Sequence, residues 1–431
     1  MPFGEGPARV LAEASDLMEQ YGLKVRNYDN YVVTGDFGPE ERQLDILAHL
    51  DVVPVSDNWT ITAPFEPLLR DGRIYGRGTS DDKGPAIAAL YAIRAVKDLG
   101  LPLRRGVRLI LGSDEECGSS DLEYYYSREK EAPCSFTPDA DFPLINLEKA
   151  RLQKSFSAEI SVQKGEPGVE SFAAGTKVNV VPDLAVSVIN GPNPEAVRAA
   201  AAECGERTGA VFTVEEEKDG RLRITARGKA SHAMMPEGGI NAGTALLELL
   251  AGLDLGDSSS SLLIRSLHDV FPHGITDGTS QGIAMEDEKS GALTLNTGII
   301  TLENGKLSGM LDLRIPLCGT DENVTKLLDD RLTAAGFTPD SSVIVPAHYV
   351  PEDSAFVKTL LAAYEEHFGE KAEPLYTGGG TYVHHLERGV AFGCARDGVD
   401  NHMHGGDEFM ETEVLFKSSV LFADVIMRLC G

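Results

Sequence analysis

Long apolar runs are missing from this chain. No hydrophobic stretch approaches the roughly 20 residues that a membrane-spanning helix needs, and the N-terminus lacks the basic-then-apolar pattern of a secretory signal. Cysteines are few and scattered: the six of them lie far apart and form no C-x-x-C pair. Such spacing favours free thiols in a reducing compartment. We therefore expect a cytoplasmic protein that has no membrane partner.

Basic residues are also in short supply. The 431 residues include 39 lysines and arginines against 67 aspartates and glutamates, which gives a formal net charge of -28. Nucleic acids and anionic membranes bind basic patches, so neither is an expected partner. A solvated acidic surface accounts for most of this charge, and part of it suits a metal site in which cations neutralise carboxylates. The length allows two or three domains.

An apolar run that begins at Leu44 predicts a buried strand, and this strand leads to His49 and Asp51. Side chains two residues apart on a strand point to the same face, so the imidazole and the carboxylate would lie together. A carboxylate beside a metal-binding histidine fixes the orientation of its ring. Taken alone, the pair is a weak signal, and a structural histidine is the favoured interpretation.

Acidic residues follow further predicted elements. Asp81 and Asp82 stand in a glycine-containing loop just before a predicted helix, where they could simply complement the helix dipole. Three carboxylates at 114–116 follow a predicted strand at 107–111, and Asp139 lies at another strand-like end. Ligands bind at this end of the strands in open α/β sheets. Adjacent carboxylates repel one another unless a cation or solvent intervenes, so a metal site is the alternative to an ordinary surface turn.

The pattern changes between about 150 and 345. A strand is predicted over 178–189 and a helix over 194–207, and hairpin turns are predicted at Asp219-Gly220 and Asn304-Gly305. This order indicates an antiparallel sheet with helices on one face. We therefore predict an α/β catalytic domain whose mixed sheet is flanked by helices, interrupted by an α+β lid domain. The predicted catalytic domain comprises residues 1–149 and 346–431, and the predicted lid comprises residues 150–345.

Two imidazoles and three carboxylates form the candidate ligand set: His49, Asp81, Glu116, Asp139 and His404. Imidazole combined with carboxylate suits zinc, with cobalt or manganese as alternatives. Two metal ions bridged by one carboxylate and one water would polarise a carbonyl and lower the pKa of the water. Glu115, which adjoins a candidate ligand, is the candidate general base.

The sequence resembles a family of dinuclear-zinc peptidases and deacylases that includes carnosinase, aminoacylase and the PepV-type bacterial dipeptidases, and it is most similar to the last of these. The similarity extends over almost the whole chain and rests on motifs that occur in the family's order: HLDVVP, YGRGTSDDKGP, DEE, TPDADFP, VNVVPD, SHAMMPEGGINA, LDLRIP and GGGT. It implies a zinc-peptidase-like catalytic domain, two bound Zn²⁺ ions (Co²⁺ or Mn²⁺ in their place) and a small peptide substrate.

The resemblance also implies a role for each matching residue of the catalytic domain. His49 and Asp139 would bind the first metal ion, while Glu116 and His404 would bind the second. Asp81 would bridge both ions, with a cis peptide bond to its neighbour. Two of the matching residues would serve catalysis, Asp51 by orienting the first histidine and Glu115 as the general base. His402 is the competing candidate for the final ligand position.

Other matching residues would contact the substrate. Asn179 and Arg314 of the lid would hold the substrate carboxylate, and His232 would stabilise the oxyanion. The glycine turn would contact the substrate backbone through Gly378, Gly379, Gly380 and Thr381. One departure stands beside this turn, where His384 replaces an arginine that relatives often carry.

The predicted function is that of a metallopeptidase, a hydrolase that cleaves dipeptides with a free N-terminal amine. A bridging water activated by two metal ions would attack with the help of the glutamate base. Aspartate at position 139 supports this substrate class, because the family's deacylases tend to carry glutamate there. The alternatives are an N-acyl-amino-acid deacylase, of the desuccinylase or acetylornithine deacetylase type, and a non-catalytic peptide-binding protein. A lid long enough to supply His232 within one chain predicts a monomer.

Overall fold

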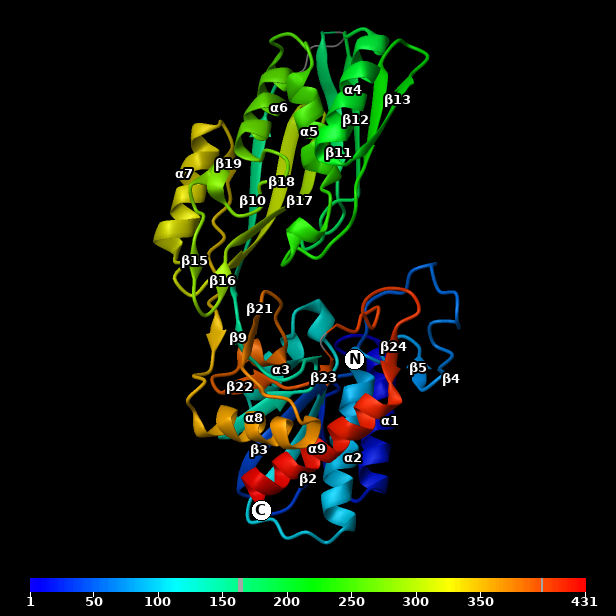
Figure 1. Ribbon diagram of the computed structural model, residues 1–431, viewed down its shortest axis with the longest axis vertical. Coiled ribbons are helices and arrows are strands. Elements are labelled where there is room, and N and C mark those ends of the chain that lie inside the picture. Colours follow the sequence, from blue (N-terminus) through cyan, green and yellow to red (C-terminus); the bar gives the residue numbers. More distant parts are fainter. Residues whose placement is uncertain (162–165, 397) are drawn as a thin grey trace. The chain divides into compact units, whose positions relative to one another are not determined.

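The computed structural model describes the whole chain except residues 162–165 and 397, and it divides into two compact units (Figure 1). We call the unit formed by Met1–Glu148 and His348–Gly431 the catalytic unit, after its predicted role, and we call Lys149–Ala347 the insert. The fold prediction is confirmed: a mixed sheet with helices makes up the catalytic unit, and a separate antiparallel sheet makes up the insert.

The catalytic unit is built on a mixed sheet with the strand order β1-β2-β6-β3-β7-β22-β9-β20, in which β21 also pairs with β9. The strands are β1 (Lys24–Tyr28), β2 (Val32–Phe37), β3 (Arg42–His49), β6 (Gly106–Gly112), β7 (Cys134–Thr137), β9 (Ile145–Glu148), β20 (His348–Tyr349), β21 (Leu375–Thr377) and β22 (Gly389–Ala391). Strands β6, β3, β7 and β22 run parallel to one another, whereas the strands on either side of these four pair antiparallel to them. Smaller pairings join β4 (Leu68–Arg70), β5 (Arg73–Tyr75) and β24 (Phe409–Glu411), and join β8 (Ala140–Asp141) to β23 (Cys394–Ala395).

Helices cover both faces of this sheet. They are α1 (Glu5–Gln20), α2 (Lys83–Asp98), α3 (Ser120–Tyr126), α8 (Ala355–Phe368) and α9 (Thr412–Cys430), with the short 3₁₀ helices η1 (Glu115–Cys117) and η5 (Tyr382–His385). Alternate residues of β3 enter two different cores, because Ile46 packs with α2 and α9 whereas Leu47 packs with α3 and η5. Helices α2 and α9 lie side by side (Figure 1). A strand buried on both faces reads as a continuous apolar run, which is why the sequence predicts β3.

The insert is an antiparallel sheet with the order β13-β14-β12-β11-β17-β18-β10-β19. Its strands are β10 (Ala150–Glu159), β11 (Gly168–Ala174), β12 (Leu184–Asn190), β13 (Val211–Glu216), β14 (Leu222–Arg227), β17 (Thr294–Glu303), β18 (Lys306–Ile315) and β19 (Thr338–Pro339), with a separate pair of β15 (Glu286–Asp287) and β16 (Gly291–Ala292). Its helices are α4 (Pro194–Thr208), α5 (Ala242–Gly252), α6 (Ser259–Val270) and α7 (Lys326–Ala334), with the short η2 (Pro236–Gly238), η3 (Thr279–Gln281) and η4 (Asp321–Thr325). One apolar core joins these helices to the sheet.

Local sequence signals predict most of the insert correctly. The two predicted hairpins are confirmed, and Asn304 and Gly305 both have positive φ, as a tight two-residue hairpin turn requires. The helix predicted over 194–207 is α4. The strand predicted over 178–189 is wrong in its first half, because β12 begins only at Leu184. Pro182 has no N–H to donate to a ladder, so the regular pairing starts after it.

Two expectations from composition can be compared with the structure. Each of the six cysteines, all of them in the described part of the chain, is a free thiol, as expected. Within the described residues, none of the helices combines the length and the hydrophobicity that are needed to cross a membrane.

Candidate metal centre

Three parallel strands end at the candidate site. His49 is the last residue of β3 and lies opposite Gly112, the last residue of β6. The acidic segment at 114–116 follows β6 directly, and Asp139 follows β7. Asp81 comes from the loop before α2, and His404 comes from the loop before β24. Side chains distant in sequence therefore meet at the carboxyl ends of adjacent strands, where open α/β sheets bind their ligands.

The first ligand group consists of His49, Asp81 and Asp139. The Nε2 atom of His49 lies 2.9 Å from Asp81 Oδ1 and 3.5 Å from Asp139 Oδ2. One ligand atom from each of the three residues lies within 4.8 Å of the other two. These distances match a set of side chains that could surround one cation.

The second ligand group consists of Asp81, Glu116 and His404. The Nε2 atom of His404 lies 2.7 Å from Asp81 Oδ2 and 3.4 Å from Glu116 Oε1. Each carboxylate oxygen of Asp81 thus faces a different histidine, which is the arrangement that a bridging ligand requires. Among the described residues, His402 belongs to neither group, so the geometry favours His404.

The chemistry of these side chains fits two divalent cations. His49 Nε2 and Glu116 Oε1 are buried, and in the described part of the chain neither makes a hydrogen bond of regular geometry beyond the close contacts given above. Burial and the nearby Asp81 carboxylate raise the pKa of Asp139, and burial also raises the pKa of Glu116. Hydrogen bonding to Asp81 and Glu116 raises the pKa of His404 to about 10. When such a site holds zinc or a similar ion, the positive charge of the ion neutralises the negative charge of the crowded carboxylates.

Glu115 lies beside this centre without joining either ligand group in the described residues. Burial raises the pKa of its carboxyl well above the ordinary value, and the neighbouring carboxylates of Asp139 and Glu116 add to that effect. A carboxylate with a raised pKa is suited to accept and return a proton near neutral pH. The predicted role of Glu115 as general base is compatible with this environment and stays a prediction.

The carboxylates of the partly buried Asp51 and the fully buried Asp82 hold the loops that carry these residues. The Asp51 carboxylate accepts hydrogen bonds from the backbone N–H groups of Glu115 (3.3 Å) and Glu116 (3.1 Å). The ring Nδ1 of His49 lies 3.1 Å from the backbone carbonyl of Asp51 and 3.4 Å from its carboxylate, so both groups of Asp51 border the ring. Asp82 accepts from the backbone N–H of His49 at 3.0 Å, and the predicted cis peptide bond between Asp81 and Asp82 is present.

Sequence reasoning missed another buried carboxylate, that of Asp121 in α3. It accepts hydrogen bonds from the backbone of Ser113 (2.6 Å) and Asp114 (3.1 Å) and from the hydroxyl of Tyr382 (2.5 Å). The segment that carries Glu115 is therefore tied to η5. No local pattern signals this role, because Tyr382 is 261 positions away from Asp121 in the sequence.

The glycine turn is anchored by Glu148, the last residue of β9. Its buried carboxylate accepts hydrogen bonds from the backbone N–H (3.1 Å) and the hydroxyl (2.7 Å) of Thr381. The same carboxylate pairs with Nδ1 of His384 at 2.9 Å. His384 thus binds a buried acid next to the turn. Substrate contacts of Gly378, Gly379, Gly380 and Thr381 stay predictions.

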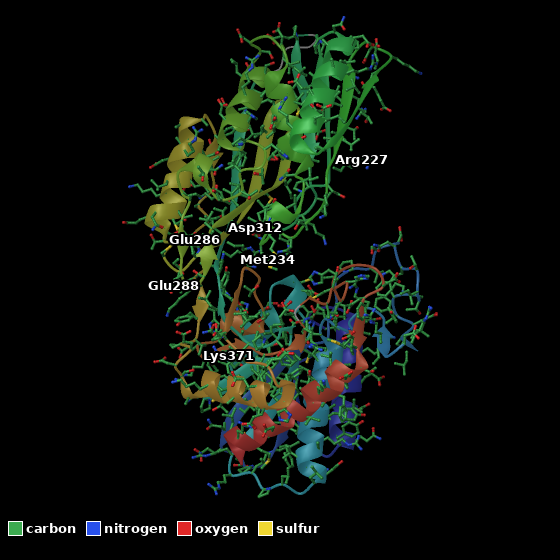
Figure 2. The ribbon with its side chains drawn as sticks, viewed as in Figure 1. Arg227, Met234, Glu286, Glu288, Asp312 and Lys371 are labelled. Carbon is green, nitrogen blue, oxygen red and sulfur yellow. The ribbon has the colours of Figure 1, made fainter. Side chains whose placement is uncertain are left out.

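The insert brings together its own predicted substrate residues. Val180 forms an isolated β-bridge with His232, and the N–H of Ala233 donates to the carbonyl of Asn179 at 2.9 Å. The Thr294 hydroxyl donates to the carbonyl of Ala233 at 3.4 Å, and Thr294 pairs in register with Arg314. Figure 2 labels Asp312 on β18. The carboxylate of Asp312 binds Nε (2.6 Å) and Nη2 (3.1 Å) of Arg314, so this edge of the guanidinium already has a partner.

Comparison with known proteins gives consistent matches over the full length. A model of the peptidase family M20/M25/M40 matches residues 46–428. The chain is 38% identical over 435 residues to a protein named "Putative dipeptidase YtjP" of Bacillus subtilis (strain 168), a match that covers 99% of this chain and 92% of the relative. A protein named "Putative dipeptidase" of Staphylococcus aureus (strain USA300) is 31% identical over 434 residues, covering 100% of this chain and 92% of the relative.

Solved structures share the fold. The crystal structure of human carnosine dipeptidase 1 is similar with a TM-score of 0.60 and 16% identity, covering 98% of this chain and 90% of that chain. A metallo-carboxypeptidase from Sulfolobus solfataricus is similar with a TM-score of 0.57 and 18% identity, covering 99% of this chain and 94% of that chain. At these identities the likeness concerns the fold alone.

Proposed function

The chain belongs to the peptidase family M20/M25/M40, and from this premise we propose that it is a metal-dependent dipeptidase that acts on dipeptides with a free N-terminal amine. Family membership confirms the prediction of a peptidase, and hence of a hydrolase. It also speaks against the alternative of a non-catalytic peptide-binding protein.

The pair of ligand groups that share Asp81 is the observation that carries the metal-dependent part of the proposal. His49 and Asp139 would hold one ion with Asp81, and Glu116 and His404 would hold the other. Zinc is the proposed ion, with cobalt or manganese as substitutes, because the donors are imidazoles and carboxylates. When bound, the two cations supply Lewis acidity toward the scissile carbonyl and the attacking water.

The chain's own side chains have distinct tasks in this proposal. Glu115 accepts the proton of the attacking water and returns it to the leaving amine. Asp51 keeps the segment of Glu115 in place through the backbone hydrogen bonds described above. In the insert, Arg314 and Asn179 bind the substrate's C-terminal carboxylate, and His232 stabilises the developing oxyanion.

The substrate class rests on two points. Both relatives described above carry the name dipeptidase. In addition, Asp139 has a shorter side chain than glutamate, which leaves space for the substrate's ammonium group and an oxygen to accept its charge-assisted hydrogen bond. A deacylase would bind an amide at this position instead. We further propose that the protein acts as a cytoplasmic monomer.

Hydrolysis of matched substrate pairs tests this proposal. The protein is stripped of metal with a chelator and reloaded with zinc, cobalt or manganese. It is then assayed on L-dipeptides, on their N-acetyl and N-succinyl forms, and on acetylornithine and succinyl-diaminopimelate. Capping the amine removes its charge, and by analogy with other desolvated charge pairs we expect a loss of roughly 2–5 kcal/mol in transition-state binding. A higher kcat/KM for acetylornithine or succinyl-diaminopimelate than for any free dipeptide would establish the deacylase alternative.

A further inference from the structure

Glu408 is a fully buried acid that the proposed mechanism does not use. Its carboxylate accepts hydrogen bonds from the backbone N–H groups of Gly78 (3.1 Å), Ser80 (2.9 Å) and Asp81 (3.2 Å). These donors belong to the loop that places the Asp81 side chain between the two histidines. One carboxylate thus fixes the backbone at the shared ligand and on its N-terminal side.

Arg77 connects the same carboxylate to the loop of His404. Its Nη1 donates to Glu408 Oε2 at 2.5 Å, and its Nη2 donates to the carbonyl of Gly405 at 2.8 Å. Gly405 directly follows His404 in the sequence, and the guanidinium is almost completely buried. A second contact joins these loops, because the amide of Asn401 donates to the Ser80 hydroxyl at 3.1 Å.

The two ligand groups are supported differently. His49 is the last residue of β3 and Asp139 follows β7, and the backbone of His49 is held by Asp82. His404 instead lies in a loop, and half of its side chain is exposed. Its distance from Asp81 therefore depends on whatever joins the loop at 77–81 to the loop at 401–408.

We propose that Arg77 and Glu408 are positioning residues that set the separation of Asp81 and His404 and thereby fit the second ligand group to a divalent cation. This inference rests on the proposed metal centre. A planar guanidinium can bind a carboxylate and a carbonyl at once, which an ammonium group cannot do with the same geometry. Because His49 and Asp139 have supports of their own, the pair should govern affinity for the second metal ion more strongly than affinity for the first.

Zinc titration of the apo-protein tests the proposal with a readout other than activity. Calorimetry and elemental analysis should give two ions per parental chain. In Glu408→Gln the side chain loses its charge and presents an amide to backbone donors. We expect the second ion to bind about 10–100-fold more weakly than in the parent, the range for groups that support metal ligands, and the first ion to lose less affinity than the second. A folded Glu408→Gln protein that binds both ions with the parental affinities would overturn the proposal.

Two further variants test whether zinc is lost because Arg77 and Glu408 no longer position the ligands, or because any change in the loop at 401–408 weakens zinc binding. Arg77→Lys keeps the charge beside Glu408 but loses the contact with Gly405, and it should weaken the second site most even if Glu408→Gln does not fold. Asp407→Asn is the matched control, because the neighbouring Asp407 binds Thr60 and Ile61 and not the loop of Asp81. An equal loss of zinc in Asp407→Asn would contradict the proposal. A parental protein that binds no metal would instead refute the proposed metal centre itself.

Discussion

At the scale of single residues, Asp81 differs from every other candidate ligand because both groups contain it. Asp81→Ala should therefore lose affinity for both ions, whereas Asp139→Ala and Glu116→Ala should each lose affinity for one. Elemental analysis after dialysis against low zinc measures the difference. If Asp81→Ala retains as much zinc as either single-group variant, Asp81 is not the bridging ligand.

Substitution of Glu115 should reduce catalysis without reducing metal binding. Glu115→Gln is nearly isosteric and belongs to neither ligand group in the described residues, so we expect parental zinc content. Loss of the general base should lower kcat roughly 10²–10⁴-fold. Steady-state kinetics on the zinc-loaded variant decide this point, and near-parental turnover would place the base elsewhere.

Asp45 predicts a pH dependence of stability that is separate from catalysis. This aspartate of β3 is buried beside Arg42, and burial raises its pKa from 3.8 to about 7. Between these values the unfolded chain releases a proton that the folded chain retains, so the contribution of Asp45 to stability falls as the pH rises from about 4 to about 7. Above pH 7 the contribution is constant and unfavourable.

Asp45→Asn should remove this dependence. Thermal unfolding at pH 5 and pH 8 is the measurement, and the Tm difference between the variant and the parent should be more favourable to the variant at pH 8. An unchanged difference at the two pH values would show that Asp45 ionises in the folded protein as it does in the unfolded chain.

At the scale of elements, β6, α3 and η5 meet at Gly112. A Cβ atom there would collide with the Tyr382 hydroxyl and the Asp121 carboxylate, which join η5 to α3. Gly112→Ala should therefore destabilise the protein by about 1–3 kcal/mol, the usual cost of overpacking. Urea unfolding measures it. Gly6→Ala is the control, because Gly6 lies in α1 with nothing within 4 Å of the added atom, and it should be neutral or stabilising.

Element by element, the sequence predicts what local periodicity and turn chemistry encode. The run before His49, the acids after β6 and the hairpin at Asn304-Gly305 all lie where they are expected. The start of β12 is mispredicted because apolar residues before Pro182 resemble a strand. The structural roles of Asp121 and Glu408 are not predicted from the sequence, for a different reason. The contacts of Asp121 with Tyr382 and of Glu408 with Arg77 span hundreds of positions, and no pattern within one segment specifies such contacts.

At the scale of the whole molecule, the chain leaves and re-enters the catalytic unit at one place. Glu148 and His348 are paired in register on the antiparallel strands β9 and β20. Their Cα atoms are thus separated by about 4.5–5.5 Å, a distance that a two-residue hairpin turn can close. Each unit also has an apolar core of its own.

Replacing residues 149–347 by a two-residue turn should therefore give a folded protein. Every candidate metal ligand lies in the catalytic unit, so this shortened chain should bind two zinc ions while losing the insert's substrate contacts and, with them, dipeptide hydrolysis. Circular dichroism and zinc titration check the first two points. An unfolded product, or one that binds no zinc, would show that the catalytic unit depends on the insert.

The pairing of Glu148 with His348 has a consequence for how such a chain can diverge. An insert whose two ends are adjacent can be gained, lost or exchanged in a single genetic event without breaking the sheet that hosts it. Under the proposed function, substitutions in the insert can alter which peptides are recognised while the metal ligands stay under separate selection. The connection between β9 and β20 thus allows the specificity and the chemistry of one enzyme to evolve at different rates.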